Sequence, residues 1–287
     1  MSHRDIIAAV VVTYNRKNLL QRCIDSILIQ SRVPDTIIVI DNGSTDGTEE
    51  MVKSESLKNP VLKYINLKAN LGGGGGFHYG ARIAFEAGYD WVWLMDDDCC
   101  ATDECLEKLV EGVTNTKDVY SPIILSIEDR KTVLWGIKAA CYTGNTEVGT
   151  LPFNGFLIHK NSLNEIGLPE KNFFIYGDDT EFNMRAKSNG KKVILVTNSV
   201  MYHPYKNVVK GLKIYKMFLN KLWTYYKLRN AIIIYKRYHY VSINQVIMFA
   251  AAFMFFLLTV KFDYLRLWLE GLKDGVNGRL YVKSSLP

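Results

Sequence analysis

Short apolar runs alternate with amphipathic stretches over the first hundred residues, and this alternation limits the fold more than any other feature of the chain. The runs "IIAAVVV", "IIVI" and "WVWLM" are apolar throughout and too short for typical helices, a pattern of strands buried on both faces. Between them, "NLLQRCIDSILIQ" and "HYGARIAFEAGY" have the apolar spacing of helices. We therefore predict an α/β protein, with a mostly parallel sheet that helices cover on both faces.

Polar side chains stand where the predicted strands end. Thr13, Asp41 and Asp96 close three of the strands, and Asn70 follows the run "LKYINL". Open parallel sheets bind ligands in the crevice at the carboxyl ends of their strands. These residues therefore predict a ligand site at that edge of the sheet.

Three consecutive aspartates follow the strand "WVWLM", although their mutual repulsion costs stability. Capping of the next helix needs only one acidic or hydroxyl side chain, and Thr102 or Asp103 already supplies it. Carboxylates are the ligands that Mg²⁺ and Mn²⁺ prefer, and Asp96 and Asp98 alternate in an extended chain and so face one side. The pattern therefore favours a divalent metal site, with His203 of "YHPY" as a candidate third ligand; by itself His203 is an ordinary histidine.

Two further segments carry candidate chemistry. Five glycines, Gly72 to Gly76, precede a predicted helix, where backbone N–H groups can approach a phosphate; a flexible linker is the alternative. In "FFIYGDDTEFNMRAK", Asp178, Asp179 and Glu181 open a helix after several aromatic residues. Neighbouring acids and apolar surroundings raise the pKa of a carboxyl group, so this pattern indicates a general base as well as a capped helix.

The charge is divided unequally along the chain. Residues 1–200 hold 21 Lys and Arg against 26 Asp and Glu, whereas residues 201–287 hold 14 against 3, net charges of −5 and +11. The basic, aromatic stretch runs into "VIMFAAAFMFFLLTV", which is uncharged but shorter than the about 20 residues that span a bilayer. These features predict binding to an anionic membrane surface rather than to nucleic acid, with a buried core helix as the alternative.

The amino terminus has no signal-peptide pattern, which predicts a cytoplasmic protein. The cysteines show no metal-site spacing, and we expect reduced thiols at Cys23, Cys99, Cys100, Cys105 and Cys141.

Taken in order, "VVTYNR", "IVIDNGSTDGT", "NLGG", "MDDD", "GDDTEFNMRA" and "YHP" resemble the motifs of glycosyltransferase family 2, the inverting sugar transferases with a GT-A fold. The resemblance covers residues 7–240. It implies a GT-A domain over residues 1–205, followed by a helical region over residues 206–287 for acceptor and membrane association at the inner face of the cell membrane.

The resemblance also implies roles for individual residues. Asp96 and Asp98 match the family's Asp-x-Asp pair, which binds Mn²⁺ or Mg²⁺ together with His203. Asp179 stands at the position of the catalytic base, and Asp178 precedes it, where the family more often has Glu. Contacts to the nucleotide sugar are implied for Thr13, Asn15, Arg16, Asp41, Asn70, Gly73, Gly74, Gly75, Asp96 and Asp97.

Two finer likenesses concern the substrates. The loop "NLGGGGGF" resembles that of bacterial galactofuranosyltransferases, although its five glycines are unbroken here, and "TYYKLRN" and "GLKDGVNGRL" recur in enzymes of cell-surface polysaccharide synthesis. These likenesses favour UDP-galactofuranose as donor, with dTDP-rhamnose as alternative, and a lipid-linked glycan as acceptor. Tyr225, Tyr226 and Arg229 are candidates for acceptor or lipid contact, or else for a core role. A non-catalytic nucleotide-sugar-binding module, or a membrane-tethered scaffold, is the alternative of another class.

Overall fold

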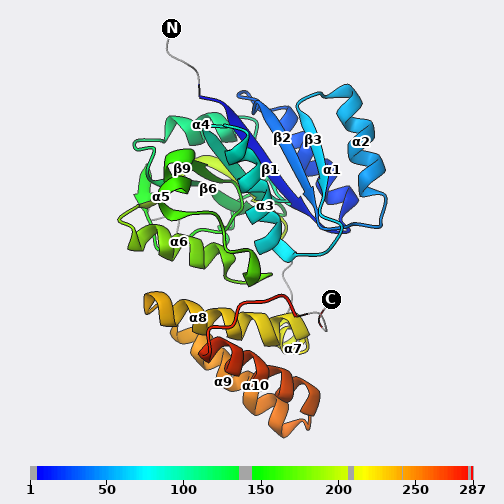
Figure 1. Cartoon of the computed structure of the whole chain (residues 1–287), viewed down its shortest axis with the longest axis vertical. Coiled ribbons are helices and arrows are strands. Elements are labelled where there is room, and N and C mark those ends of the chain that lie inside the picture. Colours follow the sequence, from blue (N-terminus) through cyan, green and yellow to red (C-terminus); the bar gives the residue numbers. More distant parts are fainter. Residues whose placement is uncertain (1–4, 136–143, 206–209, 241, 284–285, 287) are drawn as a thin grey trace.

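The computed structural model describes residues 5–135, 144–205, 210–240, 242–283 and 286, so Cys141 lies outside the described residues. Its first half is built on four parallel strands in the order β3-β2-β1-β4 (Figure 1). Their bounds are β1 (Ile7–Thr13), β2 (Thr36–Asp41), β3 (Leu62–Asn66) and β4 (Trp91–Asp96). The α/β class and the parallel arrangement that the apolar runs predict are confirmed here.

The second half extends the same sheet but is mixed. The strand order continues from β4 through β8, β6 and β9 to β5, and β7 also pairs with β9. Among the described residues of this half, β6 and β9 are parallel, whereas β4–β8, β6–β8, β5–β9 and β7–β9 are antiparallel. The bounds are β5 (Cys100–Ala101), β6 (Val119–Ser126), β7 (Asn145–Glu147), β8 (Phe156–His159) and β9 (Val193–His203).

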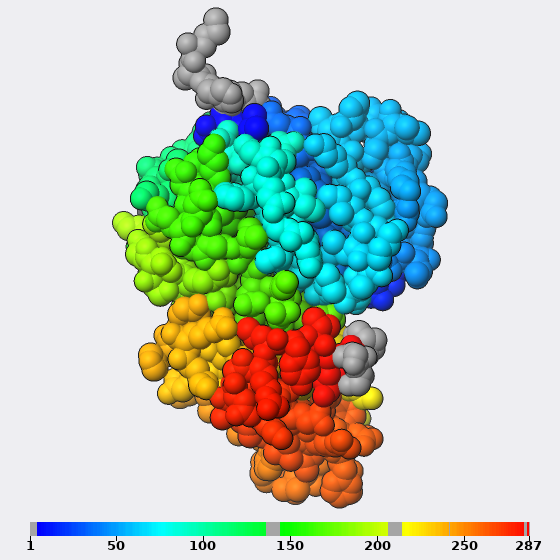
Figure 2. Space-filling model, viewed as in Figure 1, coloured from blue at the N-terminus to red at the C-terminus, as the bar shows by residue number. Residues whose placement is uncertain are grey.

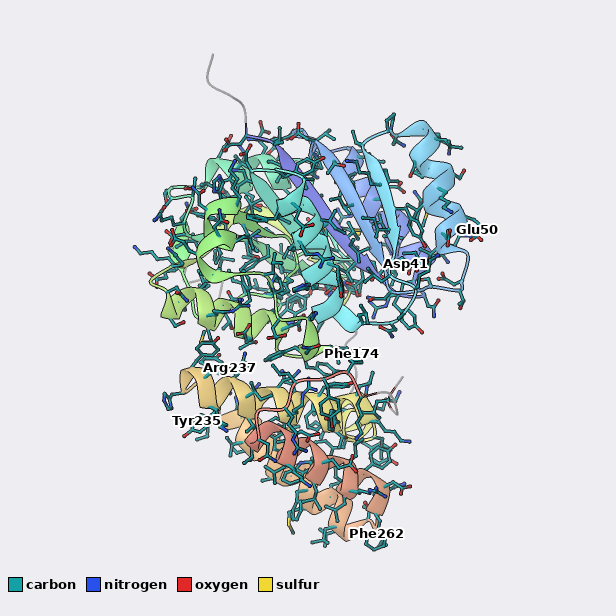
Figure 3. All side chains as sticks on the ribbon, in the orientation of Figure 1. Asp41, Glu50, Phe174, Tyr235, Arg237 and Phe262 are labelled. Carbon is teal, nitrogen blue, oxygen red and sulfur yellow. The ribbon has the colours of Figure 1, made fainter. Side chains whose placement is uncertain are left out.

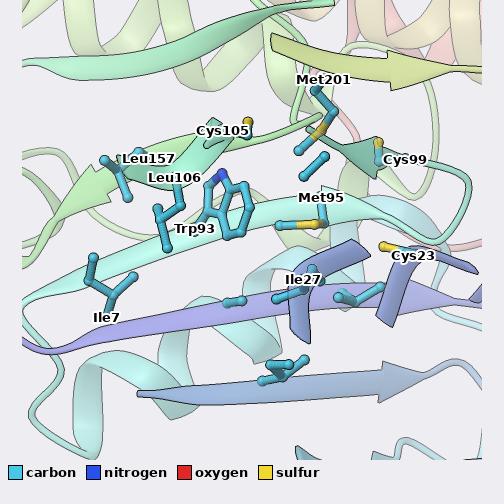
Figure 4. Close-up of a cluster of buried hydrophobic side chains, with 14 of the residues drawn as sticks. Ile7, Cys23, Ile27, Trp93, Met95, Cys99, Cys105, Leu106, Leu157 and Met201 are labelled. Atoms are coloured by element: carbon cyan, nitrogen blue, oxygen red, sulfur yellow. The ribbon is translucent and has the colours of Figure 1, made fainter. Parts of the chain in front are cut away.

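Both faces of the sheet are covered because successive side chains of its central strands point to opposite faces. Ile7, Ala9 and Val11 of β1 belong to one core cluster, which holds side chains of α1, α2 and α4 (Figure 4). Ala8, Val10 and Val12 belong to the other, which holds side chains of α3, α5 and α6. These helices are α1 (Lys17–Leu28), α2 (Thr48–Lys58), α3 (Gly72–Glu86), α4 (Cys105–Glu111), α5 (Lys160–Ile166) and α6 (Asp178–Ser188).

The glycine run is helical. We expect a phosphate-binding loop before a helix at Gly72 to Gly76, but α3 begins at Gly72 itself. A Cβ atom at Gly76 would lie 2.3 Å from Val12 Cγ1, and one at Gly74 would lie 3.2 Å from the Glu170 carbonyl oxygen. The glycines are therefore explained by close packing of the first helical turn against β1 and residues 170–174.

The remaining helices form a separate layer at the carboxyl end of the parallel strands (Figures 1 and 2). The layer consists of α7 (Lys210–Phe218), a π-helical turn η3 (Trp223–Lys227), α8 (Leu228–Tyr238), α9 (Ile243–Leu258) and α10 (Phe262–Val276). Aromatic side chains fill its interior, among them Trp223 and Phe256. The apolar run after the basic stretch forms α9, and none of the described helices combines the length and apolarity needed to cross a membrane.

Candidate active site

A cavity of about 750 Å³ lies at the carboxyl ends of β1 and β4. Its wall has three sources: the strand ends with the three aspartates, the segments around residues 150–154 and 174–180, and the helical layer, which contributes Leu222 and Lys227. Because the predicted site residues Thr13, Arg16 and Asn70 also line it, the edge that the strand ends predict is the edge where the cavity forms.

The three aspartates form a partly neutralised cluster. Asp97 is buried, and its carboxylate accepts hydrogen bonds from Thr13 Oγ1 at 2.7 Å and Arg16 Nη1 at 3.1 Å. Arg16 Nη1 also lies 3.1 Å from Asp98 Oδ2, while His203 Nε2 lies 3.1 Å from Asp98 Oδ1. The structure therefore brings together the acidic run, the arginine that follows β1 and the histidine that ends β9.

The pKa values of these acids diverge. Burial, followed by the charges of Asp98 and Asp97, raises the pKa of Asp96 well above its usual range. Burial also raises the pKa of Asp97 to about 6, although Arg16 opposes the shift. Burial acts upward on Asp98 as well, but His203 and Arg16 outweigh it and lower the pKa of Asp98. The cluster thus holds one carboxyl group, Asp96, that its neighbours leave poorly compensated.

The predicted metal ligands are only partly assembled. Asp98 and His203 are in contact, and Asp96 lines the same cavity. Across the described ranges, no group of three or more His, Cys, Asp or Glu side chains is arranged to hold an ion.

The predicted nucleoside contacts occupy two different positions. Asn70 lines the cavity and its Oδ1 accepts from Gly72 N at 2.9 Å. Asp41 is fully buried behind the cavity wall, where its carboxylate accepts from Ser44 N at 2.8 Å and Tyr64 Oη at 2.6 Å. Asn42, which the sequence analysis misses, lines the cavity instead; its place directly after Asp41 at a strand end is the signal that would have found it.

Of the predicted contacts Asn15, Gly73, Gly74 and Gly75, Gly73 alone belongs to the cavity lining. Asn15 accepts from Thr45 N at 2.7 Å and thereby joins the loops that follow β1 and β2, outside the cavity lining. Gly73 lines the cavity, and a Cβ atom there would lie 3.6 Å from Asp178 Oδ2. Gly74 and Gly75 lie behind it, with a Cβ of Gly75 only 2.4 Å from Leu71 Cβ.

Asp178 and Asp179 begin α6, directly after Gly177, whose φ of 96° puts the chain in a left-handed turn. Both line the cavity. Burial and then the charge of Asp179 raise the pKa of Asp178 to about 7, and burial also raises the pKa of Asp179, while Lys227 lowers both. A carboxylate pair whose pKa values are raised by burial at a cavity wall is suited to proton transfer.

Three further cavity residues that the sequence does not point to lie beside the predicted ones. Trp135 is 50% exposed and its ring lies edge-on to His203, with centroids 4.8 Å apart. Tyr176 lies beside Lys227, whose Nζ is 6.0 Å from its ring centroid. Lys227 ends the π-helical turn, a rare type of helix that is frequent at functional sites, but only tertiary structure reveals that turn.

Tyr225, Tyr226 and Arg229 do not contact the cavity. All three are fully buried, so the prediction of acceptor or lipid contact is wrong and the core alternative is confirmed. The reason is local, since Tyr225 Oη donates to Asp274 at 2.7 Å and Arg229 stacks at 4.7 Å over the Tyr226 ring.

The family of this chain follows from its sequence. The family model for glycosyl transferase family 2 matches residues 8–179, more than half of the chain. This chain belongs to that family and is a glycosyltransferase.

Its relatives include named enzymes. The galactofuranosyltransferase GlfT1 of Mycobacterium tuberculosis is 33% identical over 213 residues, which cover 68% of this chain and 69% of that protein. GlfT1 of Mycolicibacterium smegmatis is 28% identical over 222 residues, covering 71% and 72% of the two chains.

Solved structures confirm the GT-A fold. The 1–349 fragment of S. aureus TarS in complex with UDP-GlcNAc superposes with a TM-score of 0.63 at 18% identity, covering 95% of this chain and 81% of that one. GalNAc-T7, solved with UDP, GalNAc and Mn²⁺, gives a TM-score of 0.63 at 16% identity. The latter match covers 82% of this chain but 48% of GalNAc-T7, so this chain spans about half of that protein.

Proposed function

We propose that this protein is a metal-dependent, inverting glycosyltransferase that moves galactofuranose from UDP-galactofuranose onto a lipid-linked glycan in the synthesis of a bacterial surface polysaccharide. The observation that carries the proposal is the placement of the acidic cluster at the end of β4 and the pair Asp178–Asp179 on one cavity. The likeness to galactofuranosyltransferases supports the donor sugar.

Asp179 is the catalytic base in this proposal. Its carboxylate takes the proton of an acceptor hydroxyl, whose oxygen attacks the anomeric carbon from the face opposite the leaving diphosphate, so the configuration inverts. Thr180 fixes the base, because its backbone N–H and its hydroxyl donate to Asp179 Oδ1 at 2.5 and 3.1 Å. The Lys227 ammonium lowers the pKa of both Asp178 and Asp179 and so favours the ionised form of the pair.

The residues at the end of β4 fit a divalent cation. Two carboxylates and an imidazole are a donor set for Mn²⁺ or Mg²⁺, and the raised pKa of Asp96 marks a carboxyl group that a cation would compensate. Asp96, Asp98 and His203 would hold the ion. A bound cation stabilises the negative charge of the diphosphate leaving group. Arg16 supplies a guanidinium at the same wall, half exposed and able to meet a donor phosphate.

The remaining nucleotide-sugar contacts in this proposal come from Thr13 and Asn70 at the cavity, together with Gly73 at the first turn of α3. Asp41 acts from behind the wall. Its carboxylate fixes the loop after β2 through Ser44 and so supports Asn42, which lines the cavity.

The helical layer fits an anionic membrane surface at the cytoplasmic face. Large apolar side chains of α9 and α10 are exposed, with Ile243 and Leu258 each at 75%, and Phe262 stands at the tip farthest from the sheet (Figure 3). The exposed cations Lys261 and Arg266 adjoin them. An apolar face flanked by cations is the pattern of helices that lie in a membrane interface, where a lipid-linked acceptor would be presented.

The test is transfer from a panel of nucleotide sugars with Mn²⁺, with and without EDTA. We expect UDP-galactofuranose to raise the melting temperature and to be turned over, and EDTA to abolish transfer. Asp179→Asn should lower kcat by roughly 100-fold or more while the donor still binds. Full activity of Asp179→Asn contradicts the base assignment. If dTDP-rhamnose alone is turned over, it is the donor in place of UDP-galactofuranose. If the native chain binds a donor but transfers nothing, the non-catalytic alternative is favoured.

A further inference from the structure

Two buried side chains of α8 hold the backbone that leads into the catalytic pair. Residues 172–176, here called the base segment, begin inside the 3-10 turn η2 (Lys171–Phe173) and end immediately before Gly177. Arg229 Nη2 donates to the carbonyls of Asn172 at 2.9 Å and Phe173 at 3.1 Å. Asn230 Nδ2 lies within 3.0 Å of the carbonyls of Phe173, Ile175 and Tyr176.

The fifth carbonyl of the base segment is fixed from the opposite side. Gly74 N, in the first turn of α3, donates to the Phe174 carbonyl at 3.0 Å. Every carbonyl from residue 172 to residue 176 therefore has a donor from a distant part of the chain. Helix α3 lies on one side of the segment and α8 on the other, and Phe174 is seen between the sheet domain and the helical layer in Figure 3.

These hydrogen bonds hold a backbone segment that is strained. Phe174 and Tyr176 both have φ of 66°, a left-handed conformation that costs about 1–3 kcal/mol for a residue other than glycine. Conformations of this kind persist only where the surroundings determine them fully. The Phe174 ring also stacks on Tyr226 at 4.8 Å, so a third residue of the same stretch of helix supports the segment.

Arg229 and Asn230 also fix each other. Arg229 Nε donates to Asn230 Oδ1 at 2.9 Å, which orients the amide so that its Nδ2 faces the base segment. Arg229 Nη1 donates to the Tyr281 carbonyl at 2.6 Å, beyond α10. Two residues of α8 thus connect the end of the chain to the backbone immediately before Asp178.

A second connection holds α6 itself. Glu181, buried one turn after the catalytic pair, accepts from Tyr238 Oη of α8 at 2.7 Å and from Arg185 Nη2 at 3.0 Å. The first turn of α6 is therefore fixed to α8 both before and after Asp178 and Asp179.

We propose that Arg229 and Asn230 are positioning residues for the transfer reaction, which hold the base segment in the strained conformation that presents Asp179 to the acceptor. This inference rests on the proposed role of Asp179 as base. It assigns a catalytic task to the helical layer, in addition to acceptor and membrane association.

The decisive variant is Asn230→Asp. It keeps the size of the side chain and an oxygen for Arg229 Nε, but it removes the N–H groups that bind the three carbonyls. We expect kcat to fall by roughly 10- to 100-fold, as a displaced catalytic group predicts, with the KM for the donor unchanged. Amide hydrogen exchange in the peptide that spans residues 173–179 should become faster. Arg229→Lys, which keeps the charge but loses the planar fork, should give a smaller loss of the same kind.

The matched control is Phe256→Ala, buried in α9 of the same helical layer, whose ring packs on Phe218, Phe255 and Tyr264 rather than on the base segment. It should lower the melting temperature at least as much as Asn230→Asp, yet leave kcat unchanged below that temperature. An equal loss of kcat in Phe256→Ala, or a donor KM that rises with the loss of kcat, overturns the proposal.

Failure of this inference is distinguishable from failure of the proposed function. If Asp179→Asn stays fully active, the base assignment is wrong and with it the proposed catalytic purpose of the two residues. If Asp179→Asn is inactive but Asn230→Asp shows native hydrogen exchange and native kcat, the proposed function stands and the positioning role falls.

Discussion

Replacing Gly72 by alanine tests the packing at the start of α3 directly. A Cβ atom there would lie 2.1 Å from the carbonyl oxygen of Phe174 and 2.8 Å from its ring, and Gly72 has φ of 70°. A left-handed alanine costs about 1–2 kcal/mol, and forced overpacking adds about 1–3 kcal/mol. The free energy of unfolding should therefore fall by about 2–5 kcal/mol, a large share of the about 5–15 kcal/mol of a typical domain.

The same substitution should also affect transfer. Relief of the contact needs the Phe174 carbonyl to move by roughly 1 Å, which stretches its hydrogen bond from Gly74 N and shifts the base segment. We expect kcat to fall while donor binding is retained in the molecules that remain folded.

Urea unfolding followed by tryptophan fluorescence measures the first effect. Gly149→Ala is the control, because Gly149 has nothing within 4 Å of its added Cβ and no left-handed φ. The control should be neutral. If Gly72→Ala unfolds at the same urea concentration as Gly149→Ala, the close approach of α3 to the base segment is not as described.

Two further predictions address electrostatics and membrane binding. Lys227→Met removes a cation that lowers the pKa of Asp178 and Asp179, so both pKa values should rise and the acidic limb of the kcat–pH profile should move to higher pH; an unmoved limb contradicts the role of Lys227. Ile247→Glu combined with Leu258→Glu should reduce flotation with anionic lipid vesicles at least about tenfold, because each buried apolar side chain is worth about 1.5–3 kcal/mol. Leu57→Glu, at an equally exposed position of α2 in the sheet domain, should not change flotation; equal binding by all three proteins refutes the membrane face.

The parallel half of the sheet follows directly from the sequence, because burial on both faces leaves an unbroken apolar run. In β1, alternate residues pack on opposite faces of the sheet. Ile7, Ala9 and Val11 belong to the core cluster with α1, α2 and α4, and Ala8, Val10 and Val12 to the cluster with α3, α5 and α6. The second half is harder to predict. Its strands are shared between parallel and antiparallel neighbours, and the β6–β9 register shifts between Pro122 and Ile123, a feature that no local pattern reports.

Some residues of the site can likewise be predicted from the sequence, and others cannot. Asp98 and His203 are predicted as ligands of one cation; that role stays a prediction, but the two side chains do lie in contact, because both stand at strand ends that meet at one edge. The position of Arg229 is not predictable from its neighbours. A helix rich in Lys, Arg and Tyr predicts an exposed basic face, whereas the burial of this guanidinium depends on carbonyls more than fifty residues away. The prediction of a phosphate loop at Gly72 to Gly76 is wrong for a related reason. Close approach of a helix to residues 170–174 requires glycine, and so does a phosphate-binding loop, so the sequence does not distinguish them.

The bonds between α8 and the base segment constrain how enzymes of this type can be recombined. A chimera that takes its carboxyl-terminal helices from a relative, in order to accept a different glycan, would join foreign side chains at positions 229 and 230 to native carbonyls at 172–176. Such an exchange should yield active hybrids only when residues 170–181 are transplanted together with the helices, so the natural crossover point lies before η2 rather than after β9.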